Sequence, residues 1–577
     1  MMRSLTLAAL LLLPASTLAQ SEVSVHLYWL HEIHEARISP QKGELKFRAC
    51  PTCAVATVAH PLAVRAAGGS LEVDGKSIGG NVAEVLSPCF LDVAGNPRVG
   101  LPARLVLRSE ANRLTLTLHL GVEEYVAAVL AGESSNFSSV ESLKAMSVAV
   151  RTYAAHFRGR HQPEGFDFCD TTHCQDFHIG NISERLRAAA SATEGELLWY
   201  EGQPAATYYH RDCGGTTEAV EQAWPGTKAP YLRQLSDTFC IARGRSEWRS
   251  EITKEELRRA LTTAGLRVPT KLQNLEIVSR TPSGRVARLR LTGPATLTVP
   301  ADAFRLAVGR ELGWERIRSD LYDVRPTGGR YIFHGYGAGH GVGLCQAGAA
   351  RMGEQGRRYE EILRFYYPGT TLGLTAQGIA WKSLGGERIQ VLTTRPQVDG
   401  FLVGEAERLM HELESDTGWR FRTQPQLRIY PSVAVFRDAT GKPGWVAAST
   451  SGRVIRMQPV ATLRSAGQLE ETLRHELLHL LLESHAHPSL PLWFREGLVL
   501  VLSENAADRT APAAATDLAL LDRMLLEART QDELRRAYLA AQAQVRLLIG
   551  KFGKAKVLGW VERGLPLGLL ASPAQGH

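Results

Sequence analysis

The stretch ARLVLRSEANRLTLTLHLGVEEYVAAVLAGES, residues 103–134, changes its hydrophobic period halfway along. From Arg104 to Leu120, apolar residues recur at every second position on both sides of residues 110–112, which predicts two strands joined by a turn. From Val122 onward, apolar residues follow three-and-four spacing, which predicts a helix. A β-rich region, residues 20–120, therefore gives way here to a helical one.

The apolar face of this predicted helix leads to Glu133. A carboxylate on an inward-looking face is costly unless it is paired or functional. An apolar setting raises the pKa of a carboxyl group, so that it can hold a proton near neutral pH and act as a general acid. The same residue could instead end this helix or cap the next one, which we expect to begin at Ser138 in a capping box with Glu141.

Length and composition place limits on the rest of the chain. The 577 residues exceed what one hydrophobic core supports, so two or three domains are expected. A hydrophobic fraction of 44% and a charged fraction of 22% are ordinary for globular proteins and exclude a disordered or fibrous one. The net charge of +7 is spread without a Lys/Arg block, so nucleic acid is not an expected partner. No stretch after the N-terminus is apolar for long enough to predict a membrane span.

The first nineteen residues, MMRSLTLAALLLLPASTLA, combine an early Arg, an apolar run and small residues up to Ala19. This layout predicts a secretory signal peptide, because the apolar run is too short to cross a membrane. We therefore expect a secreted protein of the periplasm or cell envelope. Cysteines of exported proteins form disulfides by default, so Cys50 with Cys53 and Cys213 with Cys240 are predicted pairs, whereas Cys89 and Cys345 have no assigned partner.

Residues 121–370 contain an ordered series of further motifs: ESLKAMSVAVRTYA, FDFCDTTHCQDF, YYHRDCGGTTEAVEQAW, APYL, GAGHGVGLCQAGA and YEEILRFYYPGT. With GVEEYVAAVLAGES they resemble the SpoIID/LytB family, named for the stage II sporulation protein D, a lytic transglycosylase of peptidoglycan, and for amidase enhancers. The resemblance implies that Glu133 is the catalytic acid acting on glycan strands, and that a cell-wall amidase is a candidate partner. In such an enzyme the 6-hydroxyl of the sugar replaces water and leaves a 1,6-anhydro end.

The same resemblance marks polar residues for glycan binding or for holding Glu133. These are Lys144, Arg151, Tyr153, His340 and Gln346. A solvated helix face is the alternative for the first three. Ala338 and Ala347 stand where the family often has Trp, which puts the choice of glycan in doubt more than the chemistry.

Three candidate zinc ligands, Cys169, His173 and Cys174, lie within six residues. Thiolate and imidazole together suit a closed tetrahedral zinc site, whereas export favours a Cys169–Cys174 disulfide. Some members of the family resemble this arrangement with bound zinc, so we expect a metal with His161 as fourth ligand, His156 and His178 being the alternatives.

The segment RHELLHLLLESHAHPSLPLWFREGL, residues 474–498, contains an H-E-x-x-H pattern. His475 and His479 fall on one helix face, where they can share a zinc ion, and Glu476 is then the expected general base. Glu496 follows in a second helical segment and would complete a His₂Glu set. These two segments resemble gluzincin peptidases with a peptidase MA-like domain. The alternatives are a buried helix with two satisfied histidines and a zinc site without turnover.

The predicted fold class is α+β and multidomain. We expect a β-rich N-terminal region, a SpoIID-like α+β domain over residues 121–370, a linker over 371–387, and a mostly helical zincin-like α+β domain over 388–577. The predicted function is glycan cleavage fused to a zinc metallopeptidase. The rival hypotheses are a non-catalytic glycan-binding scaffold that enhances an amidase, and a peptidase that the first domain targets to the wall.

Overall fold

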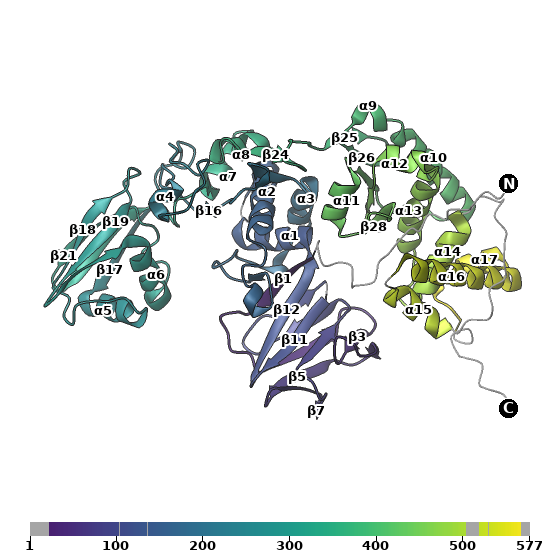
Figure 1. Ribbon diagram of the computed structural model, residues 1–577, viewed down its shortest axis with the longest axis horizontal. Coiled ribbons are helices and arrows are strands. Elements are labelled where there is room, and N and C mark those ends of the chain that lie inside the picture. Colours follow the sequence, from purple (N-terminus) through teal and green to yellow (C-terminus); the bar gives the residue numbers. More distant parts are fainter. Residues whose placement is uncertain (1–21, 103, 135–136, 504–517, 529, 567–577) are drawn as a thin grey trace. The chain divides into compact units, whose positions relative to one another are not determined.

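The computed structural model describes residues 22–102, 104–134, 137–503, 518–528 and 530–566 (Figure 1). The predicted signal peptide lies outside the described residues. The chain forms two compact units, one combining residues 24–32 with 122–378 and the other combining 33–121 with 379–577. Both contain helices and strands, so the multidomain α+β prediction is confirmed in its main outline.

The N-terminal part of the second unit is made of strands, as predicted. One set runs in the order β12-β11-β8-β3-β4 and the other in the order β10-β9-β2-β5-β6-β7. The strands β11 (Arg104–Glu110) and β12 (Arg113–Gly121) form the predicted hairpin, in register from Glu110↔Arg113. Cys50 and Cys53 form the predicted disulfide. The other strands are β2 (Glu35–Pro40), β3 (Leu45–Arg48), β4 (Ala56–Val58), β5 (Leu62–Ala67), β6 (Ser70–Val73), β7 (Lys76–Ser77), β8 (Val82–Val85), β9 (Cys89–Asp92) and β10 (Val99–Leu101).

The unit that contains the helical motifs is built around α1 (Val122–Glu133) and α2 (Val140–Phe157). The apolar face of α1 is buried, as its spacing predicts. The predicted cap of α2 was wrong by one residue, because Ser139, and not Ser138, accepts the Glu141 N–H. The helices α3 (Glu184–Ala192), α7 (Gln346–Glu354) and α8 (Tyr359–Tyr366) belong to the same unit.

Two parallel strand pairs set the positions of the candidate site in this unit. The strand β1 (Glu22–Leu27) pairs with β13 (Phe168–Cys169). The strand β16 (Tyr209–His210) pairs with β23 (Leu344–Cys345), which leads directly into α7. A third pairing joins β14 (Leu197–Tyr200) to β24 (Thr371–Gly373), so the predicted linker begins with a strand of this unit.

Residues 247–336 fold into an α+β body that the sequence pattern did not separate from its surroundings (Figure 1). This body contains the helix α5 (Lys254–Thr263) and a hairpin of β18 (Asn274–Arg280) with β19 (Val286–Thr292). Two three-stranded sheets, β17-β22-β21 and β18-β19-β20, share a core with α5 and α6. The remaining elements are β17 (Glu247–Thr253), β20 (Thr296–Pro300), α6 (Ala301–Leu312), β21 (Tyr322–Thr327) and β22 (Arg330–Tyr336).

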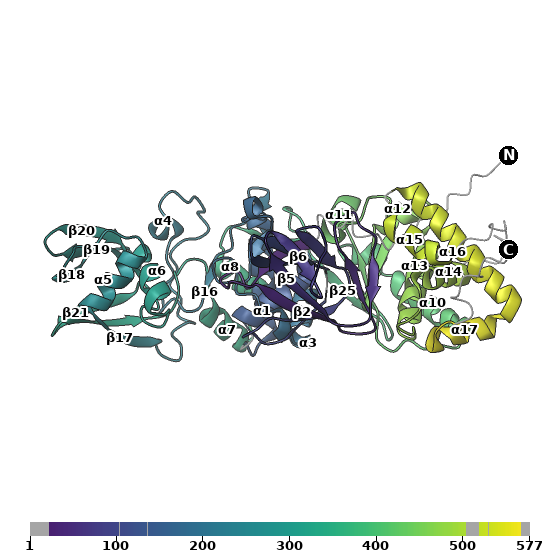
Figure 2. The same ribbon diagram turned by 90° about the horizontal axis from the view of Figure 1, so that it is seen from below.

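The C-terminal residues form a five-stranded sheet in the order β25-β26-β27-β29-β28, accompanied by helices (Figure 2). β28 (Ala448–Ser451) is an edge strand, antiparallel to β29 (Val454–Met457). The other strands are β25 (Lys382–Gly385), β26 (Gln390–Thr393) and β27 (Gln426–Ile429). The helices are α9 (Pro396–Asp399), α10 (Leu402–Thr417), α11 (Val433–Thr440), α12 (Val460–Ser465), α13 (Leu469–Glu483), α14 (Leu492–Ser503), α15 (Leu518–Glu527), α16 (Gln531–Phe552) and α17 (Lys554–Arg563). None of the described helices combines the length and apolar character that a bilayer crossing requires.

Candidate functional site

Glu133 is the last residue of α1, and it lines a cleft of about 630 Å³. The side-chain amide of Gln346 donates to Glu133 Oε2 at 2.9 Å, and the Asp176 backbone N–H donates to Oε1 at 3.2 Å. The Asp176 backbone can pass this close because Gly132 has no side chain: a Cβ there would lie 2.4 Å from the Asp176 carbonyl oxygen. Each carboxylate oxygen of Glu133 is therefore held by a donor from a different segment.

A chain of buried polar side chains also ends at Glu133. The Tyr125 hydroxyl donates to Gln175 Oε1 at 2.8 Å, and the Gln175 amide donates to the Tyr209 oxygen at 2.8 Å. Tyr209 in turn hydrogen-bonds the Glu133 carboxylate. Since the Tyr209 oxygen already accepts a hydrogen bond and has one proton, that proton is directed at Glu133. Linked hydrogen bonds of this kind polarise and rigidify one another.

The surroundings of Glu133 favour its protonated form. Burial raises the pKa of Glu133 above its ordinary value of 4.5, because the charged form loses solvation. Hydrogen bonds from Gln346, Asp176 and Tyr209 lower that pKa without cancelling the effect of burial. Glu133 also lies at the C-terminal end of α1, where the helix dipole disfavours a carboxylate. It therefore keeps a proton to a higher pH than a solvent-exposed Glu does.

One wall of the cleft is aromatic. The ring centroids of Tyr208 and Trp224 are 4.8 Å apart, and those of Trp224 and His340 are 5.1 Å apart. Flat rings of this size offer apolar faces together with polar edges. The cleft is lined by Gly132, Glu133, Tyr153, Arg160, Thr172, His173, Cys174, Asp176, Tyr208, Tyr209, His210, Arg211, Trp224, Gly339, His340 and Gln346.

His340, one of the predicted glycan-binding residues, lies in this wall as a neutral ring. Burial lowers its pKa well below 6.5, and the Val342 N–H donates to its Nδ1 at 3.1 Å. The proton of the neutral ring is therefore on Nε2. Burial also lowers the pKa of the adjacent His210 to about 3. Neither imidazole adds positive charge to the cleft at neutral pH.

Of the other predicted binding residues, Tyr153 and Gln346 line the cleft, while Lys144 does not. Tyr153 accepts a hydrogen bond from Arg160 Nη1 at 3.1 Å, which brings a cation to the cleft that the sequence analysis missed. Lys144 is half-buried, and its Nζ contacts Glu141 at 2.7 Å. The predicted contact of Lys144 with Glu133 or with a glycan in the cleft is therefore not supported.

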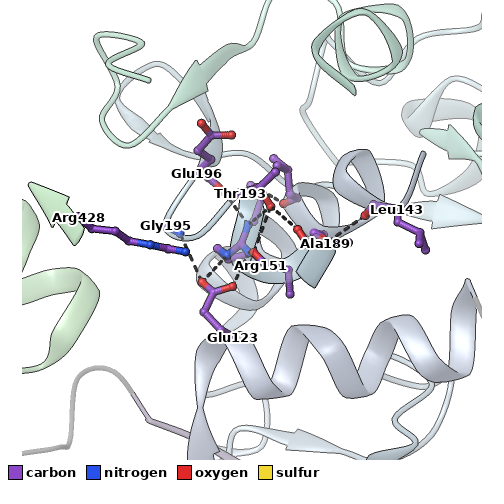
Figure 3. Close-up of polar contacts among 12 residues, drawn as sticks. Glu123, Leu143, Arg151, Ala189, Thr193, Gly195, Glu196 and Arg428 are labelled. Atoms are coloured by element: carbon purple, nitrogen blue, oxygen red, sulfur yellow. Dashed lines mark hydrogen bonds and ion pairs between the residues drawn. The ribbon is translucent and has the colours of Figure 1, made fainter. Parts of the chain in front are cut away.

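Arg151 was also predicted to contact the glycan or Glu133, and the structure places it elsewhere (Figure 3). Its guanidinium is buried and pairs with Glu123, with Nη2 to Oε2 at 2.5 Å. It also donates to the carbonyl oxygens of Ala190 at 2.9 Å and Glu196 at 3.3 Å (Figure 3). A buried guanidinium needs such partners to offset its desolvation, so Arg151 joins α1, α2 and the end of α3 and is not available to a ligand.

The predicted cysteine and histidine ligands come together at the edge of the cleft. One ligand atom from each of His161, Cys169, His173 and Cys174 lies within 4.8 Å of the others. His161 Nε2 lies 3.3 Å from Cys174 Sγ, while its Nδ1 contacts Glu164 at 2.6 Å, which fixes the ring. No bond joins the two cysteine sulfurs.

The predicted disulfide between Cys213 and Cys240 is not formed. Both sulfurs lie in a group with Cys345 and Asp237, in which one ligand atom of each residue is within 4.8 Å of the others. Spacing along the chain gave no sign that β16 and β23 lie side by side, which brings Cys345 to the same place.

The late motif forms a third group, in the C-terminal sheet-and-helix region. His475 Nε2 and His479 Nε2 lie 2.9 Å apart on one face of α13, and Glu496 Oε2 of α14 lies 3.5 Å from His479 Nε2. All three residues are buried. Burial lowers the pKa of His479 to about 4 and that of His475 well below 6.5, so both rings are neutral. Neutral imidazoles are the form that binds metal.

Glu496 provides a test of whether a metal ion fits this group. Among the described residues, neither carboxylate oxygen of Glu496 has a hydrogen-bond partner, although both are buried. A buried carboxylate without a hydrogen bond is costly, and a cation between Glu496, His475 and His479 would remove that cost. Glu476 has a partner of its own: Thr450 of β28 donates to its Oε2, and burial raises its pKa to about 7. The residues therefore fit a metal ion with three protein ligands.

Several residues of the cleft escaped the sequence analysis. They are Arg160, Gln175, Asp176, Tyr208, Tyr209 and Trp224. Three of them, Tyr208, Tyr209 and Trp224, occur inside a quoted motif, YYHRDCGGTTEAVEQAW, and Gln175 and Asp176 occur inside another, FDFCDTTHCQDF. The motifs thus carried the signal, but only the folded chain shows which of their side chains turn towards Glu133.

Two family models match the chain. Residues 110–200 match the stage II sporulation protein model SpoIID, and residues 242–343 match a domain of unknown function, DUF8618. The second match coincides with the separate α+β body around α5 and α6. Both matches end before residue 388, where the predicted peptidase domain begins.

Relatives of known sequence each cover less than half of the chain. An uncharacterized protein of Brachyspira hyodysenteriae is 30% identical over 44% of this chain and 67% of its own length. Stage II sporulation protein D of Bacillus amyloliquefaciens is 26% identical over 44% of this chain and 74% of its own length. The amidase enhancer of Bacillus subtilis is 27% identical over 41% of this chain, and the match spans only 38% of that enhancer.

Proposed function

Because the chain belongs to the SpoIID family of stage II sporulation proteins, we propose that it is an exported cell-wall enzyme that cleaves the glycan strands of peptidoglycan. The observation that carries this proposal is Glu133, a carboxyl group with a raised pKa whose two oxygens are fixed by Gln346 and Asp176 in a cleft. A general acid requires a proton available near neutral pH and a fixed direction in which to deliver it.

The proposed reaction is a transglycosylation within one sugar. Glu133 gives its proton to the glycosidic oxygen as the bond between that oxygen and C1 breaks. The Glu133 carboxylate then takes the proton of the 6-hydroxyl of the same sugar, whose oxygen bonds to C1 and closes a 1,6-anhydro ring. The group ends the cycle protonated, so one residue acts as acid and then as base.

The aromatic wall supports a sugar substrate. Tyr208 and Trp224 offer ring faces on which the apolar face of a sugar can rest, and Tyr153 and Arg160 offer polar groups at the other side of the cleft. Trp224 could thus compensate for Ala338 and Ala347, which stand where the family often has Trp. His340 and Gln346 also line this cleft, and we propose that they contact the glycan.

We further propose that His161, Cys169, His173 and Cys174 bind a structural zinc ion. Two thiolates and two imidazoles make a closed tetrahedral set with no open position for substrate. Because His173 and Cys174 also line the cleft, the ion would fix the segment whose next residues, Gln175 and Asp176, reach Tyr209 and Glu133. The zinc ion is assigned a positioning role only.

For the C-terminal region we propose a zinc metallopeptidase-like site with His475, His479 and Glu496 as ligands. A zinc ion bound there would act as a Lewis acid and lower the pKa of water. Glu476, the residue after His475 on α13, would then serve as the general base, and the Thr450 hydroxyl holds its carboxylate. The convergence of Glu496 with the two imidazoles supports this proposal.

The strand β28 suggests that the substrate at this second site is an extended peptide. Thr450, which contacts Glu476, lies on β28, the edge strand of the five-stranded sheet. An extended chain can add to an exposed sheet edge through backbone hydrogen bonds, which would bring its peptide bonds past Glu476.

The test of glycan cleavage is digestion of purified peptidoglycan with the full chain, followed by mass spectrometry of the released fragments. Transglycosylation predicts muropeptides with 1,6-anhydro ends, whereas hydrolysis would give reducing ends that are heavier by one water. Separate digestion of denuded and peptide-bearing strands would identify the preferred substrate.

A second candidate function follows from the similarity to the amidase enhancer. In that case the cleft binds glycan strands without cutting them and presents them to a separate amidase. Glycan binding without any released fragment, together with stimulation of an amidase that survives Glu133→Gln, would select this function and exclude the first.

A further inference from the structure

A second sulfur-rich group lies next to the cleft and is distinct from the predicted cysteine and histidine site. It consists of Cys213, Asp237, Cys240 and Cys345, and one ligand atom of each is within 4.8 Å of the others. Cys213 follows β16, Cys345 ends β23, and the other two residues lie on the loop between α4 (Val220–Ala223) and β17. Cys213, Asp237 and Cys345 are fully buried. Neither family match nor any motif assigns a role to this group.

Backbone and side-chain donors already hold these groups in place. Cys345 Sγ accepts the backbone N–H groups of Cys213 at 3.3 Å and of Gly348 at 3.4 Å, the latter at the first turn of α7. Asp237 Oδ1 accepts the Cys240 N–H at 3.0 Å, and its Oδ2 accepts the Tyr366 hydroxyl at 2.8 Å. In metal sites the ligating sulfurs and carboxylates are commonly oriented by hydrogen bonds from neighbouring groups, and these donors are of that kind.

The remaining contacts lie within the group and at its edge. Cys213 Sγ is 3.4 Å from Asp237 Oδ2, and Cys240 Sγ is 3.1 Å from Asp212 Oδ1. Gly348 leaves no free space over Asp237, since a Cβ there would lie 2.4 Å from its Oδ2. The carboxylate is thus fixed from one side and faces the sulfurs on the other.

A disulfide accounts for this group less well than a metal ion does. No bond joins any two of the three sulfurs. A disulfide would use two sulfurs and leave the third beside a buried carboxylate, which is costly without a cation. A tetrahedral zinc ion with bonds of about 2.3 Å to sulfur requires ligand atoms about 3.8 Å apart, which the 4.8 Å limit on this group allows.

We propose that Cys213, Asp237, Cys240 and Cys345 bind a zinc ion as a closed structural site. Three thiolates and one carboxylate fill the tetrahedral positions, so no position is left for substrate. The ion would join β16 to the start of α7, the two elements that bring Tyr209 and Gln346 to Glu133. Only this consequence for the cleft rests on the proposed glycan-cleaving function; metal binding itself does not.

The first test uses the unmodified full chain, purified without chelator. Cysteine alkylation is mapped by mass spectrometry in denaturant, before and after removal of metal by a chelator, and without any reductant. We expect Cys213, Cys240 and Cys345 to be labelled once the metal is removed, and zinc to be found by elemental analysis before that. Labelling of any two of them only after reduction would show a disulfide and overturn the proposal.

The second test compares two variants for zinc content. Cys240 is only partly buried, so Cys240→Ser disturbs packing least, and we expect it to lose one zinc equivalent per chain. Cys89→Ser removes a buried thiol from a strand outside this unit and should lose none. Equal zinc in Cys240→Ser and in the unmodified chain would contradict the proposal, whatever the effect of either variant on glycan cleavage.

Discussion

The side-chain amide of Gln346 lies 2.9 Å from Glu133 Oε2, although 213 positions separate the two residues in the chain. Glu133 ends the first helix of its unit, and Gln346 begins α7 directly after β23. Their hydrogen bond fixes the carboxylate and opposes the rise in its pKa that burial causes. The contact therefore links the orientation of the proposed acid to its protonation.

Replacing Gln346 with Ala should slow glycan cleavage roughly tenfold, since a hydrogen bond to a charged group is worth about 1.5 kcal/mol or more. The pKa of Glu133 should rise further without this donor, so the alkaline limb of the rate profile should move to higher pH. The rate of anhydro-muropeptide release across pH measures both effects. Gln355→Ala, at an exposed position, is the control. An unshifted alkaline limb would contradict the proposed effect of Gln346 on the pKa of Glu133.

The raised pKa of Glu133 also predicts how its replacement affects stability. Because the folded-state pKa lies above 4.5, the stabilising contribution of protonated Glu133 is complete below that value and is lost as pH rises through the folded-state pKa. The glutamine that replaces it in Glu133→Gln does not titrate. The free energy of unfolding of this variant minus that of the unmodified chain should therefore be larger at pH 8 than at pH 4, which means that the variant is relatively more stable at pH 8. Denaturant unfolding at the two pH values measures this difference, and a constant or opposite one would contradict the assigned shift.

Arg151 should prove to be a structural residue. Arg151→Met removes a buried guanidinium that pairs with Glu123 and donates to two carbonyl oxygens, so it should cost about 3–5 kcal/mol of stability. Addition of Glu123→Gln should recover part of that loss. The matched control is Arg187→Met, which breaks a more exposed pair with Glu124 and should cost no more than about 1 kcal/mol. Chemical unfolding ranks the variants; similar losses at the two pairs would refute the structural assignment.

The group of His475, His479 and Glu496 predicts that substitutions can affect zinc binding and peptide hydrolysis separately. Glu496→Gln and His479→Ala should each remove one zinc equivalent, because each deletes a ligand. Glu476→Gln should keep the metal and lose peptide hydrolysis, because Glu476 contacts Thr450 and not the ligand group. Glu483→Gln, at an exposed residue of the same helix, is the control. Elemental analysis gives the zinc content, and full zinc in Glu496→Gln would exclude the proposed ligand set.

Local patterns predicted the elements better than the contacts between them. The β11–β12 hairpin and α1 were predictable because side-chain period and turn residues act over a few positions. Exact helix starts were less so: the cap of α2 is Ser139 and not Ser138, because two neighbouring serines offer the same capping group.

Grouped metal ligands were most predictable where one short segment carries several of them. His161, Cys169, His173 and Cys174 lie within fourteen positions of sequence, so their grouping could be anticipated. Cys345 joins Cys213 only through the pairing of β16 with β23, which no local pattern encodes. For the same reason Arg151 was assigned to the cleft, because its helix position gave no sign of its ion pair with Glu123.

The most direct test of the central claim compares the unmodified chain, Glu133→Gln and Glu124→Gln in the release of 1,6-anhydro muropeptides from purified peptidoglycan. Glutamine keeps the shape of Glu133 but cannot give or take the proton, so release should fall by about 10²-fold or more. Glu124→Gln, on the same helix, should retain the full rate. Equal release by Glu133→Gln and the unmodified chain would contradict the assignment of Glu133 as the general acid and base.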